Sequence, residues 1–335
     1  MSACPFACPS HSPRIVDAPS AAPSKPSMSS TSPLLDPDLR MRPPGEPLPP
    51  PLRAHGGPLA DAFARWLRQR DDPAHPPEKL ALTRALQALS EDEVRAHARR
   101  QAAIALGGGW SHWSWAVPAA TVASLLGIAL PDVDAQRRLH ARLRAMAAGL
   151  GATAGPDAVR TGGEAVVALL DALDDAERRS PDAPLQWTLL RHAAPARWTD
   201  RATFTANRLA LIWQSHEAGA ALLGHALLDW RSTGRMPTRE DLLRIAREGG
   251  AVRVTRRFDL RQEPATPVSV PLAGTPHPFG DGAHRCPGQG LALSSIQAAL
   301  TWLGEQPALR PPRPGAPLSL PNMDIPQFLD EERHP

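Results

Sequence analysis

Residues 277–303, HPFGDGAHRCPGQGLALSSIQAALTWL, carry the strongest structural signal in the chain. Within this stretch Cys286 is surrounded by three glycines, Gly280, Gly282 and Gly288. A glycine-rich loop lets backbone N–H groups close around one atom. If that atom is the sulfur of Cys286, the loop amides and the start of the apolar helix that follows favour the thiolate, the form that binds a metal. The stretch therefore predicts a thiolate that faces a metal.

The pattern F-G-x-G-x-H-x-C-x-G in this stretch resembles the haem-binding loop of the cytochrome P450s. The matching positions are Phe279, Gly280, Gly282, His284, Cys286 and Gly288. The resemblance implies that Cys286 is the axial thiolate ligand of a haem b, where electron donation from sulfur favours cleavage of the O–O bond. It also implies that Phe279 packs beside the sulfur and that His284 hydrogen-bonds a haem propionate.

Two other interpretations of the loop are open from the residues alone. The glycines could form a turn around a buried, unreactive cysteine. A zinc site could use His277, His284 and Cys286, although the sequence offers neither an evident fourth ligand nor the usual paired spacing.

The composition is that of a globular protein, with 42% hydrophobic and 21% charged residues among 335. Lys and Arg exceed Asp and Glu by only 37 to 34, so we expect no nucleic-acid surface. No apolar run of about eighteen residues occurs, and the amino terminus lacks the basic start and apolar core of a signal peptide. We therefore expect no membrane span and a cytoplasmic location.

The chain divides into two predicted parts. Residues 1–54 are rich in Pro and Ser and nearly lack an apolar pattern, which predicts a disordered arm. Residues 55–335 are expected to form a mainly α, P450-like haem-binding domain with a reduced β portion. Only VRVTRRF and PVSVPLA have the alternation of strands. Helices are expected near 58–70, 77–102, 118–127, 131–149, 162–179, 184–193, 199–231, 237–248 and 288–304.

The resemblance also implies a set of cations for the haem propionates, which need charge-assisted donors. The stretch HPPEKLALTRAL is similar to the propionate-side helix of the family. Lys79 stands where the family has a histidine, and Arg84 or Thr83 lies near the position of its arginine. In VRVTRRF, Arg256 matches the remaining propionate ligand. Lys79 and Arg84 could equally lie on a solvated helix face, and His75 is a weaker candidate for the same role.

The chain departs from the family at two places beyond the cysteine loop. The E-x-x-R ion pair has two possible frames, in which either Arg244 and Arg247 or Asp241 and Arg244 occupy the two positions. The second frame restores an acid–arginine pair at helical spacing. Only the twenty residues 259–278 separate Phe258 from Phe279, fewer than the family uses for its sheet and meander. We expect this deletion to expose the proximal side of the haem or to require another element to cover it.

The stretch LIWQSHEAGAALLGHALLDW resembles the P450 helix that crosses the distal face of the haem. Where many members read A-G-x-E-T-T, this chain keeps Glu217 but has Ala218 and Gly219 at the hydroxyl positions. The family's threonine orders the water that delivers protons to dioxygen, a relay with tight distance demands. These three residues are the predicted catalytic positions. Proton relay by Glu217, use of peroxide, and hydrogen abstraction followed by coupling all stay open, and Glu217 could instead be a salt-bridged helix residue.

We interpret the chain as a shortened, divergent P450-type monooxygenase or oxidoreductase that carries out oxidative tailoring of a small or carrier-bound metabolite in secondary metabolism. The alternative is a catalytically silent P450-like protein that binds haem or stabilises a partner. A ferredoxin-type electron donor is expected to dock on the cysteine side. The basic face available there is formed by Arg95, Arg99 and Arg100.

Three tryptophans lie close together in GGGWSHWSWAVP, at Trp110, Trp113 and Trp115. They could line a substrate pocket, but aromatic packing in a core is the favoured interpretation. His216 and His225 are likewise expected to be packing or surface residues, since a second axial histidine would block the site.

Overall fold

The structure is a computed structural model that describes residues 32–194 and 197–329. Most of the predicted disordered arm, residues 1–31, lies outside the described residues. The rest of it is ordered, which corrects the boundary expected at residue 54. These residues form a 3-10 helix, a strand and the start of a helix, namely η1 (Pro33–Leu35), β1 (Leu39–Arg40) and α1 (Pro50–His55).

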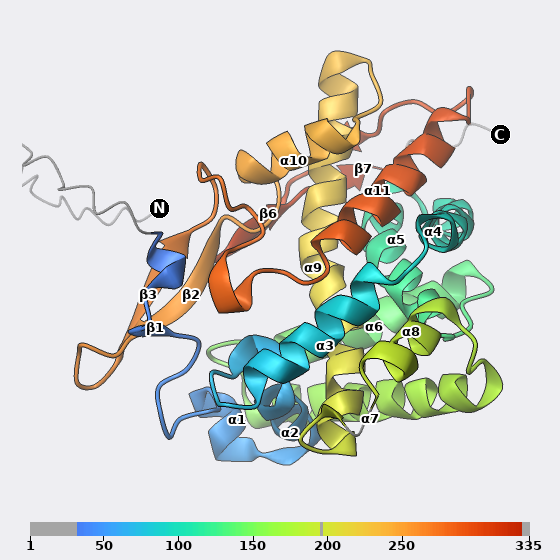
Figure 1. Cartoon of the computed structure of the whole chain (residues 1–335). Helices are drawn as coiled ribbons and strands as arrows, with labels where there is room; N and C mark the ends of the chain where they lie inside the picture. The colour runs from blue at the N-terminus through green and yellow to red at the C-terminus, as the bar shows by residue number, and fades with distance from the viewer. Residues whose placement is uncertain (1–31, 195–196, 330–335) are drawn as a thin grey trace, which may run out of the picture. The chain divides into compact units, whose positions relative to one another are not determined.

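The prediction of a mainly α fold is confirmed by the long helices that make up most of the unit (Figure 1). After α1 they are α2 (Gly57–Arg65), α3 (His75–Gln87), α4 (Glu91–Ala105), α5 (Trp110–Leu125), α6 (Val133–Gly149), α7 (Pro156–Arg179), α8 (Pro184–His192), α9 (Arg201–Thr233), α10 (Arg239–Arg247) and α11 (Gln289–Gly304).

Two helix boundaries differ from the prediction for identifiable reasons. The helix expected over 77–102 is broken into α3 and α4, because Ser90 and Glu93 form a capping box that starts a new helix. The helix expected from residue 118 begins at Trp110 instead, and Pro118 lies inside it. The prediction placed the start of the helix at Pro118, because proline is common at the first helical position.

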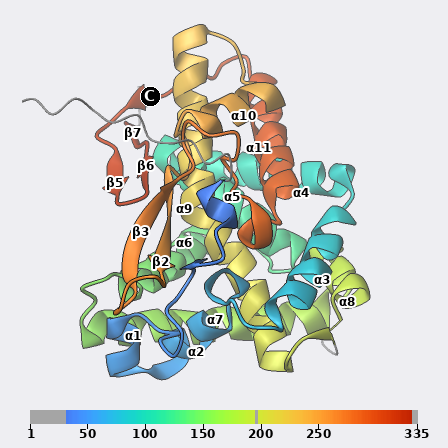
Figure 2. The same ribbon diagram turned by 60° about the vertical axis from the view of Figure 1, so that its left-hand side comes forward.

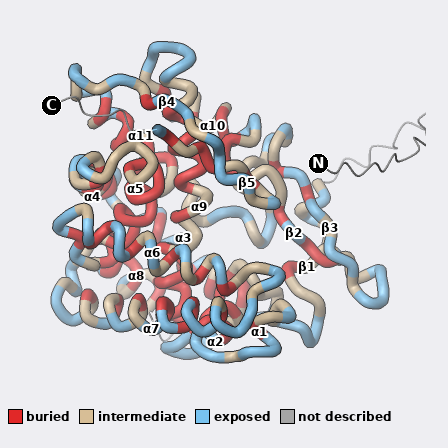
Figure 3. The backbone as a smooth tube through the Cα atoms, turned by 180° about the vertical axis from the view of Figure 1, so that it is seen from behind, coloured by how far each residue is buried: buried red, intermediate tan, exposed pale blue. Residues whose placement is uncertain are grey.

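Helix α9 has 33 residues and runs the length of the folded unit, with α5 packed along it (Figures 1 and 2). Its amino-terminal half packs into one apolar core through Leu209 and Ile212. Its carboxy-terminal half packs into a second core through Leu223 and Leu227. Figure 3 shows buried residues, in red, on α5, α9 and α11. The middle of α9 lies between the two apolar cores and lines the cavity described below.

The two strands predicted from the sequence form a hairpin at one edge of the helical part (Figure 2). Strands β2 (Val254–Asp259) and β3 (Thr266–Pro271) are antiparallel, and β1 adds to β2 to complete a three-stranded sheet. Four short strands make two further pairs near the carboxyl end: β4 (Arg313–Pro314), β5 (Leu318–Leu320), β6 (Met323–Ile325) and β7 (Phe328–Leu329).

The ion pair at α10 follows the second of the two predicted frames. Arg244 lies 3.7 Å from Asp241 and donates at 2.6 Å to Asp229 of α9. Arg247, the arginine of the first frame, is exposed. The pair therefore ties α10 to α9. Of the helices in 32–194 and 197–329, none combines the length and apolar character required to cross a membrane.

The tryptophan cluster on α5 packs in the core, as favoured from the sequence. Trp113 is fully buried and its indole N–H donates to the carbonyl of Ala102 at 3.0 Å. Trp115 is buried against His216 and His140, whose ring nitrogens lie 2.9 Å apart. His216 is therefore a packing residue.

Candidate active site

The cysteine loop is held in shape by its own backbone and by the amino-terminal segment. The Cys286 N–H donates to the Phe279 carbonyl at 2.8 Å, and Gly280 and Gly282 both have positive φ, at 76° and 62°. A Cβ at Gly282 would lie 2.8 Å from a methyl group of Leu35 in η1. These two positions therefore require glycine, and the loop ends directly before α11.

A cavity of about 220 Å³ lies between this loop and the middle of α9. Most residues predicted for the site line it together, although they come from three separate segments: Lys79 of α3, Ala218 and Gly219 of α9, and Phe279, Gly280, His284, Cys286 and Gly288 of the cysteine loop. Gly219 is required by packing, because a Cβ there would come within 2.4 Å of Pro118. The predicted loop and the predicted distal helix thus face one space.

Four predicted site residues do not line the cavity, namely Glu217, Arg84, Gly282 and, as described below, Arg256. Glu217 is half-buried beside it, and burial raises the pKa of its carboxyl against the opposing effect of Arg68 and Arg144. Arg84 is exposed on another face of α3, so the structure corrects its predicted role as a propionate ligand. Gly282 lies in the loop but faces the groove on the other side.

The arginine of β2 that faces the cavity is Arg257, which corrects the prediction of Arg256. Strand alternation puts Thr255 and Arg257 on the lined face and leaves Arg256 exposed, with its guanidinium over the ring of Phe258. The sequence already contained this signal in the two-residue period of the strand, but the choice between neighbouring arginines depended on knowing which face is buried.

The cavity carries cations without anionic partners. The pKa of Lys79 is lowered to about 8, mainly by burial and also by the neighbouring Arg68 and Arg257, against the opposing effect of the sulfur of Cys286. Within the described chain no ion pair reaches any of these three cations, and Arg257 Nη1 is buried without a hydrogen-bond partner. Leaving buried donors unpaired is costly. The residues present therefore fit a group that brings carboxylates into the cavity, as the propionates of haem would.

His284 is held by Asp71, a residue that the sequence analysis missed. His284 Nε2 lies 2.7 Å from Asp71 Oδ1, and its other ring nitrogen is buried without a partner in the described residues. Burial opposes ionisation of Asp71, but hydrogen bonds from His284 and from the Met41 N–H keep its pKa below the usual value. The ring of His75 packs 4.6 Å from that of His284. No local pattern could reveal a contact that spans 213 residues of chain.

The electrostatics of Cys286 differ from the expectation that the loop alone favours a thiolate. Burial raises the pKa of the Cys286 thiol, and the Gly288 N–H, Lys79 and Arg68 offset this only in part. A metal cation is therefore needed to stabilise the thiolate. The zinc alternative finds no support in the part of the chain that the structure describes, where no three His, Cys, Asp or Glu side chains converge on a metal-sized site.

An open groove of about 710 Å³ borders the other side of Cys286. It runs between α3 and the start of α11, and Cys286 lines it as well as the cavity. The expectation that the shortened segment 259–278 exposes the proximal side of a haem, or requires another element to cover it, stays a prediction. Of the basic residues predicted on α4, Arg95 pairs with Asp92 and Arg99 with Glu305, so two of the three charges are neutralised.

Comparison with solved structures identifies the fold. The structure of P450BioI in complex with acyl carrier protein ligated with hexadec-9Z-enoic acid matches with a TM-score of 0.63 and 16% identity, over 88% of this chain and 87% of that chain. Epothilone B-bound cytochrome P450epoK gives 0.65 and 16%, over 87% and 85%. CYP109B1 from Bacillus subtilis gives 0.57 and 14%, over 84% and 91%.

The class of fold is thus that of the cytochrome P450s, and the resemblance inferred from the cysteine loop is confirmed at the level of the fold. No family model matches the sequence, and no curated protein matches it significantly. The chain is accordingly a divergent example of this fold, similar to its neighbours in three dimensions and remote from them in sequence.

Proposed function

We propose that the chain is a haem-thiolate oxidoreductase of the cytochrome P450 type. The observation that carries the proposal is the cavity itself, in which a cysteine lies opposite the small residues of α9 and beside unpaired cations. Haem b suits this arrangement because it has a thiolate-binding iron and two propionates.

Four side chains would hold the haem. Cys286 would bind the iron, while Lys79 and Arg257 would pair with the propionates. His284, fixed by Asp71, has a free ring nitrogen for a propionate oxygen. When bound, the haem supplies the oxidising chemistry, and the protein supplies position and access.

On the distal side, the residues of α9 leave space and provide one titratable group. Ala218 and Gly219 have no side chain that would obstruct a substrate above the haem plane. Glu217 follows the cavity-lining Ser215 by two positions, and its raised pKa lets the carboxyl hold and release a proton near the cavity wall. A relay through ordered water or through a polar group of the substrate would replace the missing threonine hydroxyl. Use of peroxide or oxidative coupling needs no such relay and remains compatible with the proposal.

The proposed substrate is a small or carrier-bound metabolite that is oxidatively tailored. P450BioI, which shares the fold, was solved with an acyl carrier protein, and this supports a carrier-bound substrate. The open groove beside Cys286 supports docking of a ferredoxin-type donor on that side.

A second candidate is a haem-binding protein without turnover. The loss of both hydroxyls after Glu217 favours it, because those positions normally serve proton delivery. The retained loop would serve haem binding in both candidates, so turnover is the property that separates them.

The carbon monoxide difference spectrum of the reduced, purified protein tests the haem-thiolate assignment. We expect a thiolate-type Soret band in the wild type and its loss in Cys286→Ala. Absence of haem in both proteins would contradict the proposal. Turnover with peroxide, compared with ferredoxin, reductase and dioxygen, then separates the mechanisms. A thiolate band without turnover in either system would support the silent alternative.

A further inference from the structure

Two carboxamide side chains of α9 line the cavity, Asn207 and Gln214. They are about two helical turns apart, so they lie on the same face of the helix. A carboxamide carries two N–H donors and an oxygen that accepts, and such groups need hydrogen bonds when they are shielded from water. The two residues differ in whether the protein itself provides these bonds.

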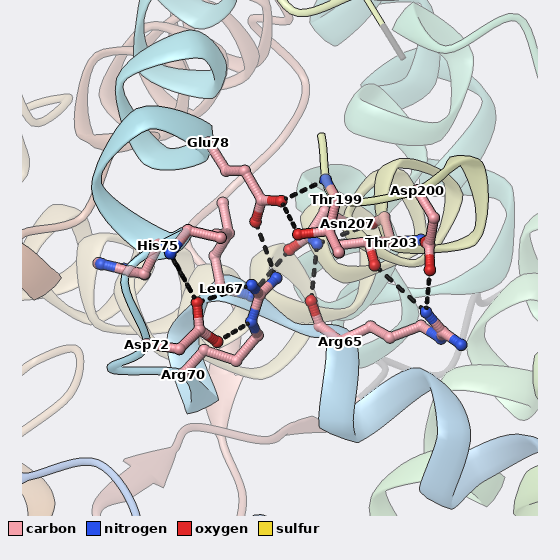
Figure 4. A network of polar contacts seen from close by, with 11 residues as sticks. Arg65, Leu67, Arg70, Asp72, His75, Glu78, Thr199, Asp200, Thr203 and Asn207 are labelled. Carbon is pink, nitrogen blue, oxygen red and sulfur yellow. Dashed lines mark hydrogen bonds and ion pairs between the residues drawn. The ribbon is translucent and has the colours of Figure 1, made fainter. Parts of the chain in front are cut away.

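The amide of Asn207 is fully engaged in holding the fold together (Figure 4). Its oxygen accepts from the Leu67 N–H at 2.9 Å. Its nitrogen donates to the carbonyls of Arg65 at 2.9 Å and of Thr203 at 2.8 Å. These bonds fasten the turn before α3 to α9, and they leave Asn207 no donor for a ligand.

The amide of Gln214 has none of these contacts. Within residues 32–194 and 197–329 its side chain makes no hydrogen bond, although it is half-buried and lines the cavity. The adjacent Ser215 is different, because its hydroxyl donates to the Ile212 carbonyl of its own helix at 2.8 Å. Gln214 therefore has both a free donor and a free acceptor in the cavity wall.

Two further neutral polar side chains line the cavity outside α9. Ser295 of α11 donates to carbonyls of its own helix. Thr255 of β2 has no hydrogen-bond partner in the described part of the chain. It lies on the same face of the strand as Arg257, which is the side proposed for the haem propionates. On the distal side, Gln214 is thus the neutral polar group that is free to bind.

The sequence around Gln214 shows an exchange of small and polar positions on α9. In the pattern A-G-x-E-T-T, Gln214 and Ser215 stand at the two small positions, whereas Ala218 and Gly219 stand at the two hydroxyl positions. A larger residue is excluded at Gly219, because a Cβ there would lie 2.4 Å from Pro118 of α5. The polar side chains of this wall have therefore moved back by one helical turn.

Helical spacing makes Gln214 a neighbour of Glu217 and Ala218. Residues three and four positions apart are adjacent on the surface of a helix. A carboxyl donates a hydrogen bond only when it is protonated, whereas the N–H groups of a carboxamide donate at every pH. Gln214 thus offers a permanent donor beside the residue that replaces the family's hydroxyl.

We propose that Gln214 is the hydrogen-bond donor of the distal site, where its side-chain N–H groups bind the acceptor atom of a small ligand such as water. The inference rests on the proposed function, because it requires a haem in the cavity. It assigns to this carboxamide the ordering of water that the resemblance implies for a hydroxyl at the position of Ala218. The amide oxygen stays free to accept from the same water.

The C–O stretching frequency of the carbon monoxide complex, measured by infrared spectroscopy on the haem-loaded protein, tests this inference. A donor beside the oxygen of carbon monoxide polarises the ligand and lowers this frequency. Gln214→Leu replaces the amide by an apolar side chain of similar size, so we expect the band to move to higher frequency. Gln214→Met, which also lacks a donor, should move it in the same direction.

Three other variants serve as matched controls. Ser215→Ala removes a hydroxyl that already donates to Ile212, and Thr255→Val removes the hydroxyl on β2. Both should move the band less than Gln214→Leu does. Gln262→Leu replaces an exposed glutamine outside the cavity and should leave the frequency unchanged.

The remaining outcomes count against the inference. An unchanged frequency in both Gln214 variants, each with a thiolate-type Soret band, would overturn it. An equally large shift in Ser215→Ala or Thr255→Val would show that a hydroxyl is the donor instead. Loss of the Soret band from both Gln214 variants would assign this residue to haem retention. A wild type without a Soret band overturns the proposed function as well, whereas a loaded wild type whose frequency ignores Gln214 overturns only this role.

Discussion

The cysteine loop and the middle of α9 face the same cavity, yet they differ in how far they keep the residues of the P450 fold. The loop has glycine at each position where a positive φ or a close contact requires it, and Cys286 and His284 both line the cavity. The α9 segment keeps Glu217 but has no hydroxyl in the two positions after it. The side that would anchor a haem is thus intact, and the side that would deliver protons has changed.

This difference suggests that the residues that hold a haem and the residues that deliver protons can change independently in this fold. Haem anchoring, as proposed, depends on a thiolate, a few donors and a loop of fixed shape. Proton delivery can come from another carboxyl, from the substrate or from the oxidant itself. The α9 segment is therefore the place where a divergent protein can change without losing its cofactor.

The largest effect is expected on the loop side, from Cys286→Ala. This change removes the proposed iron ligand, so the thiolate-type Soret band should disappear completely. Arg285→Gln alters the exposed neighbouring residue and should retain the band. A Cys286→Ala protein with an unchanged carbon monoxide spectrum would mean that the loop is not the anchor.

Next in size is the difference between two adjacent arginines of β2. Arg257→Gln removes a buried donor from the cavity and should speed haem transfer to apomyoglobin about tenfold or more. Arg256→Gln removes an exposed arginine on the opposite face and should leave the rate near that of the wild type. The reverse order would show that the strand register assigns the wrong residue to the cavity.

The haem affinity of the protein should also depend on pH, because Lys79 titrates. Its pKa is about 8 in the haem-free protein, so at higher pH the lysine must take up a proton when a propionate pairs with it. The Cys286 thiol releases a proton on binding iron in both proteins, so the ratio of haem affinities of Lys79→Arg and the wild type isolates Lys79 and should rise by up to about tenfold for each pH unit above 8. Lys79→Arg keeps the charge and should remove this part of the pH dependence. A ratio that stays constant with pH would exclude Lys79 as the titrating group.

The smallest effect is expected on α9, from Gly219→Ala. The new methyl group would meet the ring of Pro118, which is rigid, so the two helices must separate slightly. We expect a loss of about 1–3 kcal/mol in the free energy of unfolding, measured by urea denaturation. Gly290→Ala on α11 is the matched control, since open space surrounds that position and alanine favours a helix. Similar stability of both variants would show that α9 tolerates bulk here and can change freely.

Features that depend on neighbouring residues could be predicted from the sequence, and features that depend on distant ones could not. The cysteine loop and α11 are contiguous, so their glycines, cysteine and apolar helix stand together in the printed chain. Helical spacing already indicated that Asp241 and Arg244 could pair. Asp229, which lies closer to Arg244 than Asp241 does, is on α9 and could not be predicted in this way. The choice between the two frames therefore needed the packing of α10 on α9.

The cations of the cavity also show that contacts between distant segments could not be predicted from the sequence. Lys79 was predicted because it stands in a recognisable stretch, whereas Arg68 lies in a short turn with no pattern of its own. Asp71 reaches His284 only because the turn before α3 folds back onto the loop. Periodicity within one segment separates its two faces, but tertiary packing decides which face is turned toward the cavity.

The contact of Leu35 with the loop at Gly282, together with the pairing of β1 on β2, has a practical consequence for anyone who makes this protein. A chain trimmed to start at residue 55, where the proline-rich composition ends, would lose the strand that covers the outer edge of the hairpin. The bare edge would then offer its unpaired amides to other molecules and invite aggregation. Expression should therefore begin no later than residue 32, so that this fastening segment is retained.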